Sequence, residues 1–231
     1  MDFDRNENTD YIYNTLTSDR ITQMSNGRIP KMSPQQAAGL IGSWIVETGD
    51  PTLSNLDVVE KGSGNGRGLS QYTGVRRIPY DRARAAALSS GLDPNKATWQ
   101  MQYFADEYVG KYDQQGRSLS GWTRNLESSP QGRTPADYAD YYTGSEEEER
   151  GYFRPRIPHL PERKKAAQQV FQAYQQQPQQ QMAIPDKPKP LPTPQMAIPQ
   201  RPTAPPKPPQ NTNPLSGIIN PILNVLGIPT N

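Results

Sequence analysis

Carboxylates are the side chains of this sequence that are best suited to chemistry. The chain contains no Cys and a single His, His159, which excludes a disulfide framework, a thiolate nucleophile and a zinc site with several imidazoles. Glu47 stands out among the acids because it lies near the end of an apolar segment, 39–49, just before a turn. Apolar neighbours and the negative end of a helix dipole both raise the pKa of a carboxyl, as a general acid requires. On position alone, a Glu at a helix end is more often a solvated surface residue.

A glycine-rich segment follows Glu47 along the chain. It reads GNGRGLSQYTGVRR at 64–77, and its turn-forming residues predict a loop and a small β-hairpin. Its glycines would let the backbone approach a ligand closely. The segment does not fit a phosphate-binding loop, because no Lys followed by Ser or Thr closes it. The acidic run 146–149 lacks the ligand spacing of a calcium loop, so we expect neither a metal nor a cofactor.

The elements that must position these residues are mostly helices. Ser33 followed by Pro34 predicts a helix start, and apolar residues at three- and four-residue spacing predict a helix buried on one face. Gly39 and Gly42 on this helix would permit close packing by another element. Further helical patterns occur at 79–90, at 94–111, from Thr134 onward and at 161–175. We therefore expect a mainly α domain over 31–176 that contains the small hairpin.

Composition divides the rest of the chain into an N-terminal arm, a Pro/Gln-rich spacer and an apolar C-terminal segment. Hydrophobic residues make up 32% of the sequence, below the usual ~45–50% of a globular chain. Residues 1–30 resemble a polar N-terminal arm. Residues 177–213 predict a Pro/Gln-rich extended spacer with an imperfect repeat, because proline fits neither a helix interior nor a central strand. Residues 214–231 are apolar again and predict a docking peptide, with a collapsed chain end as the alternative.

Charge and hydropathy limit the partners. The net charge of +2 gives no indication of a nucleic-acid partner. The N-terminus is polar and acidic, unlike a signal peptide. No apolar run approaches the ~20 residues of a membrane span. We therefore expect no nucleic acid and no membrane span.

Several charged residues fit ordinary structural roles. Arg76 and Arg77 are expected to form ion pairs with Asp81 or Glu107, although they could also contact an anionic polymer. His159 lies among prolines, so we expect it to be an ordinary loop residue.

An ordered series of motifs points to one family. The apolar helix ends in Glu-Thr-Gly at 47–49, and Gly-Leu-Ser-Gln-Tyr-Thr-Gly-Val-Arg follows at 68–76. Three later segments continue the series in order: QMQYFADEYVG at 100–110, RTPADYADYY at 133–142, and Glu149-Arg150 with PERKKAAQQVFQAY at 161–174. Together they resemble the phage tail lysozyme family, a branch of the lysozyme-like superfamily. The resemblance covers about 30–175. It departs from the family pattern at Thr48 (usually Ser), at Tyr72 (usually Trp) and in the acidic run 146–149.

The resemblance implies an α+β lysozyme-like fold and cleavage of the β-1,4 bonds of bacterial peptidoglycan. Glu47 would be the general acid that protonates the leaving oxygen. Gly68, Gln71 and Tyr72 would bind the glycan, although Gln71 could equally tie the hairpin to the Glu47 helix.

The second carboxylate stays open at this point. Asp57 and Glu60 lie between Glu47 and the glycine-rich segment, and nothing in their spacing selects one. If neither faces the cleft, a lytic transglycosylase route becomes attractive, in which the sugar's own 6-hydroxyl attacks and no second acid is required.

The Pro-rich segment suggests a particle-bound enzyme, because a lysozyme made only for host lysis needs no tether. We expect a virion-associated glycosidase, bound through residues 178–231 to tail, baseplate or internal virion proteins, that acts on the host cell wall. The alternative is a catalytically silent structural virion or cement protein built on the same domain. A third hypothesis, an SH3-type ligand, explains only the Pro-rich segment.

Overall fold

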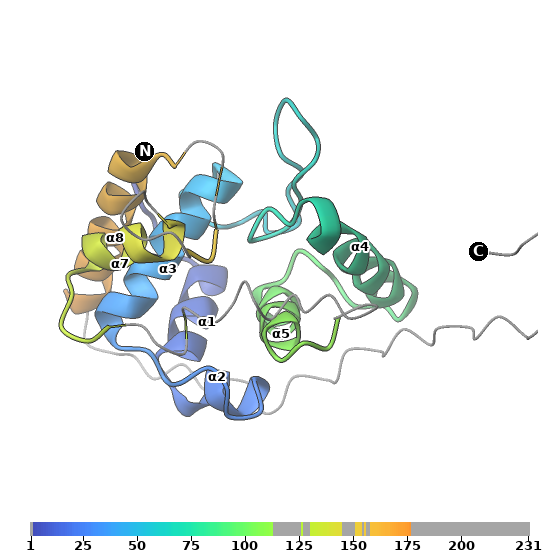
Figure 1. Ribbon diagram of the computed structural model, residues 1–231, viewed down its shortest axis with the longest axis horizontal. Helices are drawn as coiled ribbons and strands as arrows, with labels where there is room; N and C mark the ends of the chain where they lie inside the picture. Colours follow the sequence, from blue (N-terminus) through green and yellow to red (C-terminus); the bar gives the residue numbers. More distant parts are fainter. Residues whose placement is uncertain are drawn as a thin grey trace, which may run out of the picture. The chain divides into compact units, whose positions relative to one another are not determined.

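The computed structural model describes residues 2–112, 126, 130–144, 151–153, 155 and 158–176. All of these belong to the first of two compact units, Met1–Pro194. The expected spacer (177–213), the docking peptide (214–231) and the acidic run 146–149 lie outside the described residues. The helices are α1 (Glu7–Leu16), α2 (Asp19–Met24), α3 (Pro34–Thr48), α4 (Gly74–Ser89), α5 (Ala97–Tyr108), α7 (Pro135–Thr143) and α8 (Leu160–Gln175) (Figure 1).

Helix α3 is central because two glycines allow other helices to pack directly on it. Ser33 caps its start, with the side chain accepting a hydrogen bond from the Gln36 amide. A Cβ added to Gly39 would lie 2.5 Å from the Cβ of Tyr138 on α7, and one added to Gly42 would lie 2.4 Å from the backbone nitrogen of Ala167 on α8. Figure 1 accordingly shows α7 and α8 against α3. The predicted glycine contact face is confirmed.

Residues 7–24 form α1 and α2 and pack into the main core. Ile12, Leu16 and Ile21 are fully buried there, and α1 lies against α3 and α5. The sequence predicts a polar arm over 1–30, whereas these helices belong to the packed domain. The difference arises because so many polar residues surround the few apolar positions that the helical period is hard to see.

A second core, made largely of aromatic rings, joins α4 to α5. Tyr72, Tyr80, Trp99, Tyr103 and Tyr112 fill it. The Tyr72 and Tyr80 ring centroids are 4.8 Å apart, and those of Tyr103 and Tyr112 are 4.7 Å apart. Such close ring pairs add to the stabilisation from burial alone. This aromatic core holds α4 beside α5.

The ends of α4 and α5 differ from the predicted ranges. Helix α4 begins at Gly74 rather than at 79, with Pro79 inside it. Helix α5 spans 97–108 rather than 94–111, because the Asp93 side chain accepts a hydrogen bond from the Asn95 amide and so forms a turn before the helix. An Asp at such a position stabilises turns as well as helix caps.

The predicted β-hairpin between α3 and α4 is wrong. Residues 50–73 contain only isolated antiparallel bridges, Val59 with Arg67 and Arg67 with Tyr72. Successive turns interrupt the pairing before a ladder can extend, and Gly62, Gly64 and Gly68 all have positive φ. The described domain is therefore mainly α, and the segment 50–73 is a loop.

Candidate active site

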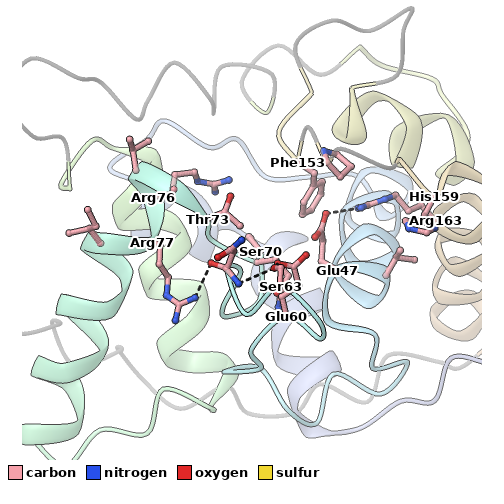
Figure 2. Close-up of a pocket in the computed structure, with 17 residues that line it drawn as sticks. Glu47, Glu60, Ser63, Ser70, Thr73, Arg76, Arg77, Phe153, His159 and Arg163 are labelled. Atoms are coloured by element: carbon pink, nitrogen blue, oxygen red, sulfur yellow. Dashed lines mark hydrogen bonds and ion pairs between the residues drawn. The ribbon is translucent and has the colours of Figure 1, made fainter.

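A cleft of about 1060 Å³ opens beside the end of α3. Its walls come from α3, the loop before α4, the first turn of α4, and the residues leading into α8. The lining includes Glu47, Glu60, Ser70, Gln71, Phe153 and Arg163 (Figure 2). The structure thus brings together three of the predicted site residues, Glu47, Glu60 and Gln71.

Glu47 lies on the cleft wall in an ion pair with Arg163. Nη2 of Arg163 donates to Oε1 of Glu47 at 2.6 Å, and the two side chains are 2% and 14% exposed, respectively. Arg163 is itself fixed, because Nη1 donates to the Ser43 carbonyl at 3.2 Å and Nε to the Pro158 carbonyl at 2.7 Å. Its guanidinium also lies over the Phe153 ring, 5.2 Å from the centroid. A buried, immobile cation therefore holds the Glu47 carboxyl in one orientation.

Glu60 reaches the same cleft from the loop, as Figure 2 shows. Its Oε2 accepts a hydrogen bond from the Gly66 amide at 3.1 Å and another from the Ser63 hydroxyl. Glu60 is exposed to solvent, and these bonds hold it to its own loop. Two carboxylates from different elements thus face one cleft.

Asp57 is not among the residues that line the cleft. Arg67 donates to both of its oxygens, at 2.8 and 3.0 Å, Arg84 donates to Oδ2 at 2.6 Å, and the Tyr80 hydroxyl lies 3.0 Å from Oδ1. Burial by itself would raise the pKa of Asp57, but the hydrogen bonds and charges of Arg67 and Arg84 outweigh it and lower the pKa. Asp57 ties the loop to α4.

The three predicted glycan-binding residues occupy different environments. Gln71 lines the cleft with a positive φ of 43°, and its Nε2 donates to the Gly68 and Val58 carbonyls. Gly68 packs on Tyr80, since an added Cβ would lie 2.5 Å from that ring. Tyr72 is fully buried in the aromatic core. Gln71 alone of the three contributes a side chain to the cleft wall.

A buried hydrogen-bond network runs beneath the cleft. Arg76 on α4 forms a bidentate ion pair with Glu107 on α5, with distances of 2.7 and 2.8 Å, and donates to the Tyr152 hydroxyl at 2.9 Å. The Tyr152 hydroxyl lies 3.1 Å from Oγ of Ser70, to which Nε1 of Trp44 on α3 donates at 2.8 Å. This network connects the elements on both sides of the cleft.

The ion pairs predicted for the two arginines are confirmed. Arg76 pairs with Glu107, and Arg77 pairs with Asp81 at 2.7 Å. The Arg76 pair is buried, whereas the Asp81 side chain is 47% exposed. The two neighbouring arginines therefore sit in contrasting surroundings.

Ser70, Arg163 and His159 are among the cleft residues that were not selected from the sequence. His159 is an exposed loop residue, as expected, and it also precedes α8 as its N-cap, with a φ of 47°, and lines the cleft. Arg163 had a visible signal, because it precedes the apolar residues Ala166 and Ala167 by three and four positions. A cation on the buried face of a helix needs a partner. Ser70 had no such signal.

Two properties of the described part of the chain bear on the site. No group of three or more His, Cys, Asp or Glu residues gathers there in a way that could hold a metal ion. No helix there is long and apolar enough to cross a membrane.

A family model described as phage tail lysozyme matches residues 7–174. The match begins with α1 and ends within α8, so it includes both N-terminal helices and every described residue of the cleft. No curated protein and no solved structure matches the chain.

Proposed function

Because this chain belongs to the phage tail lysozyme family, we propose that it is a peptidoglycan glycosidase whose general acid is Glu47. The family implies a lysozyme-like domain that acts on peptidoglycan. The observation that carries the catalytic proposal is the position of Glu47 at the end of α3, on the wall of a cleft that Glu60 and Gln71 also line (Figure 2).

The ion pair with Arg163 defines how Glu47 would deliver a proton. Breaking a glycosidic bond requires protonation of the leaving oxygen as positive charge develops on the sugar. Oε1 of Glu47 accepts the hydrogen bond from Arg163, and a protonated carboxyl retains this acceptor when its proton sits on the other oxygen. We therefore assign proton donation to Oε2, with Arg163 as the residue that orients the carboxyl.

The second carboxylate of the proposal is Glu60. It shares the cleft with Glu47, whereas Asp57 is held by Arg67 and Arg84. Glu60 would activate a water or stabilise the developing charge. If Glu60→Gln retains full activity, the transglycosylase route is favoured instead. The products separate the two routes, since hydrolysis leaves reducing-end muramic acid and the transglycosylase leaves anhydro-muramic acid.

The first prediction tests the catalytic carboxyl. Glu47→Gln should lower the turnover of purified cell wall by about 100-fold to 10,000-fold, because the amide cannot donate the required proton. The thermal unfolding midpoint should fall, since an amide still accepts the bond from Arg163 but no longer balances its buried charge. Glu7→Gln, an exposed residue of α1, is the matched control and should retain activity.

Two outcomes would contradict the catalytic proposal. If Glu47→Gln is as active as the unchanged protein, Glu47 is not the acid. If both proteins lack activity on several wall types, the alternative of a structural virion or cement protein is favoured.

Association with a phage particle is the second part of the proposal. The Pro-rich composition of 178–231 supports a tether to tail, baseplate or internal virion proteins. Deleting 178–231 should preserve wall degradation and abolish incorporation into particles, measured by immunoblotting of purified virions. Normal incorporation of the shortened protein would refute the tether.

A further inference from the structure

Ser70 lies where the cleft meets the buried hydrogen-bond network. It lines the cleft, yet only 4% of it is exposed. A serine hydroxyl has one hydrogen to donate and two lone pairs that accept. The partners of Oγ therefore decide what Ser70 can offer to a ligand.

One lone pair of Ser70 accepts a hydrogen bond from Trp44. The distance from Nε1 of Trp44 to Oγ is 2.8 Å. An indole nitrogen can only donate, so the direction of this bond is fixed. Trp44 is itself fully buried on α3, which holds the donor in place.

The second lone pair accepts from Tyr152. Burial raises the pKa of Tyr152 to about 12, so its hydroxyl keeps its hydrogen at neutral pH. The Tyr152 oxygen already accepts from Nη2 of Arg76 at 2.9 Å, and its own hydrogen needs an acceptor. Oγ of Ser70 is 3.1 Å away, whereas Oε2 of Glu107 is 3.4 Å away and already bonded to Arg76 at 2.8 Å. The hydrogen of Tyr152 is therefore directed to Ser70.

With both lone pairs occupied, the hydroxyl hydrogen of Ser70 is left to donate. None of the residues that the structure describes accepts a hydrogen bond from it. The loop that carries it is fixed on the other side as well, because the Leu69 amide donates to Oε1 of Gln100 on α5 at 3.2 Å. Ser70 is thus a hydrogen-bond donor that its neighbours hold in a fixed position at the cleft.

We propose that Ser70 is a specificity-determining donor that binds the acetamido oxygen of an N-acetylated sugar in the cleft. This inference rests on the proposed function, because it assumes that a glycan strand occupies the cleft. The acetamido oxygen only accepts hydrogen bonds, while the ammonium of a de-N-acetylated sugar only donates them. Ser70, which can only donate, complements the first group and has no partner in the second.

The chemistry predicts discrimination between two forms of one polymer. A buried donor left without a partner loses its hydration and regains nothing. Sites built to hydrogen-bond one substrate group reject analogues that lack it. The protein should therefore prefer N-acetylated strands to de-N-acetylated strands by at least about tenfold, the ratio that a single lost hydrogen bond supports.

The test compares soluble glycan strands that are N-acetylated or chemically de-N-acetylated. Ser70→Ala should raise KM for N-acetylated strands about tenfold, leave kcat within about twofold, and bring the preference between the two strands close to one. Tyr152→Phe is the control for structural damage. It frees one lone pair of Ser70 but leaves the hydroxyl hydrogen, so thermal stability should fall while KM for N-acetylated strands stays within about twofold.

Binding to the Glu47→Gln variant separates this inference from the catalytic proposal. Calorimetric titration should show the preference for N-acetylated strands in Glu47→Gln, and its loss in Glu47→Gln combined with Ser70→Ala, whether or not the unchanged protein is catalytic. An unaltered preference in Ser70→Ala would overturn the role of Ser70. An equal rise in KM for N-acetylated strands in Ser70→Ala and Tyr152→Phe would overturn it as well, because the effect would then be structural.

Discussion

At the scale of single residues, hydrogen-bond partners distinguish Asp57 from Glu47, although the sequence offers both as candidate catalytic acids. Asp57 has both oxygens bonded to arginines, Arg67 and Arg84. Glu47 has one arginine contact, to Oε1 from Arg163, and lines a cleft. A carboxylate with saturated oxygens has little capacity left to handle a proton or a water. The arginine contacts of the two carboxylates therefore favour a chemical role for Glu47 and a structural role for Asp57.

This distinction predicts a pH-dependent stability for Asp57→Asn. The pKa of Asp57 is lowered in the folded protein, so its contribution is present above the unfolded value of about 3.9 and is lost as the pH falls through the folded value. The variant should be less stable by about 1–3 kcal/mol at pH 7. Because the unchanged protein loses this contribution in acid, the difference should shrink as the pH falls below the unfolded value.

Urea unfolding at pH 7 and in acid measures the effect. Asp81→Asn is the control, since its exposed pair with Arg77 four positions earlier contributes only about 0.3–0.5 kcal/mol. An equal loss for Asp57→Asn at both pH values would show that packing, not charge, is responsible.

At the scale of elements, the close approach of α3 to α8 positions Arg163 against Glu47, the proposed general acid. Gly42 of α3 meets the backbone of Ala167 on α8. Glu47 lies five residues further along α3, and Arg163 lies four residues earlier on α8. Their contact joins residues 116 positions apart. The helix separation set by Gly42 thus determines whether the ion pair can form.

Gly42→Ala should therefore destabilise the protein, although alanine is the better helix former. The new Cβ would lie 2.4 Å from the Ala167 nitrogen, and overpacking of this kind costs typically about 1–3 kcal/mol. That exceeds the gain of about 0.5–1 kcal/mol in helix propensity. Thermal unfolding and wall turnover should both decline, because α8 would carry Arg163 away from Glu47.

The control for this substitution is its reverse at an exposed site. Ala85→Gly on α4, which is exposed, should cost only its helix propensity of about 1 kcal/mol and leave turnover unchanged. A stabilised Gly42→Ala would show that the helices can separate freely, contrary to the proposed role of their contact.

At the scale of the whole described domain, one polar network joins the two hydrophobic cores. Trp44 belongs to the main core, and Tyr72 and Tyr103 belong to the aromatic core. The Arg76–Glu107 ion pair connects to Trp44 through Tyr152 and Ser70. Breaking one member of a buried pair leaves an uncompensated charge.

Arg76→Met should destabilise the protein by about 3–5 kcal/mol, because Glu107 would remain buried without its partner. Its neighbour supplies the matched control, since Arg77→Met removes a pair whose Asp81 side chain is 47% exposed and should cost at most about 1 kcal/mol. Chemical denaturation of both variants measures the difference. Similar losses would indicate that the Arg76 network contributes no more than a surface pair.

The sequence by itself determined the features that depend on near neighbours. Helix starts at Ser33 and Thr134 follow from caps that bond three positions ahead, and the glycine face of α3 follows from helical spacing. The family motifs identified the phage tail lysozyme family, which the match over 7–174 confirms. These signals involve residues that are close in the sequence, so they can be recognised without knowing how the helices pack.

Tertiary structure alone decided the composition of the cleft. Which carboxylates share it, why Arg163 meets Glu47, and why Ser70 is left as a donor all depend on contacts between segments that are distant in sequence, such as Ser70 with Tyr152, 82 positions apart. The predicted β-hairpin was wrong because successive turns interrupt the pairing along 50–73. Periodicity describes one element at a time, whereas hydrogen-bond partners are chosen by the packing of several.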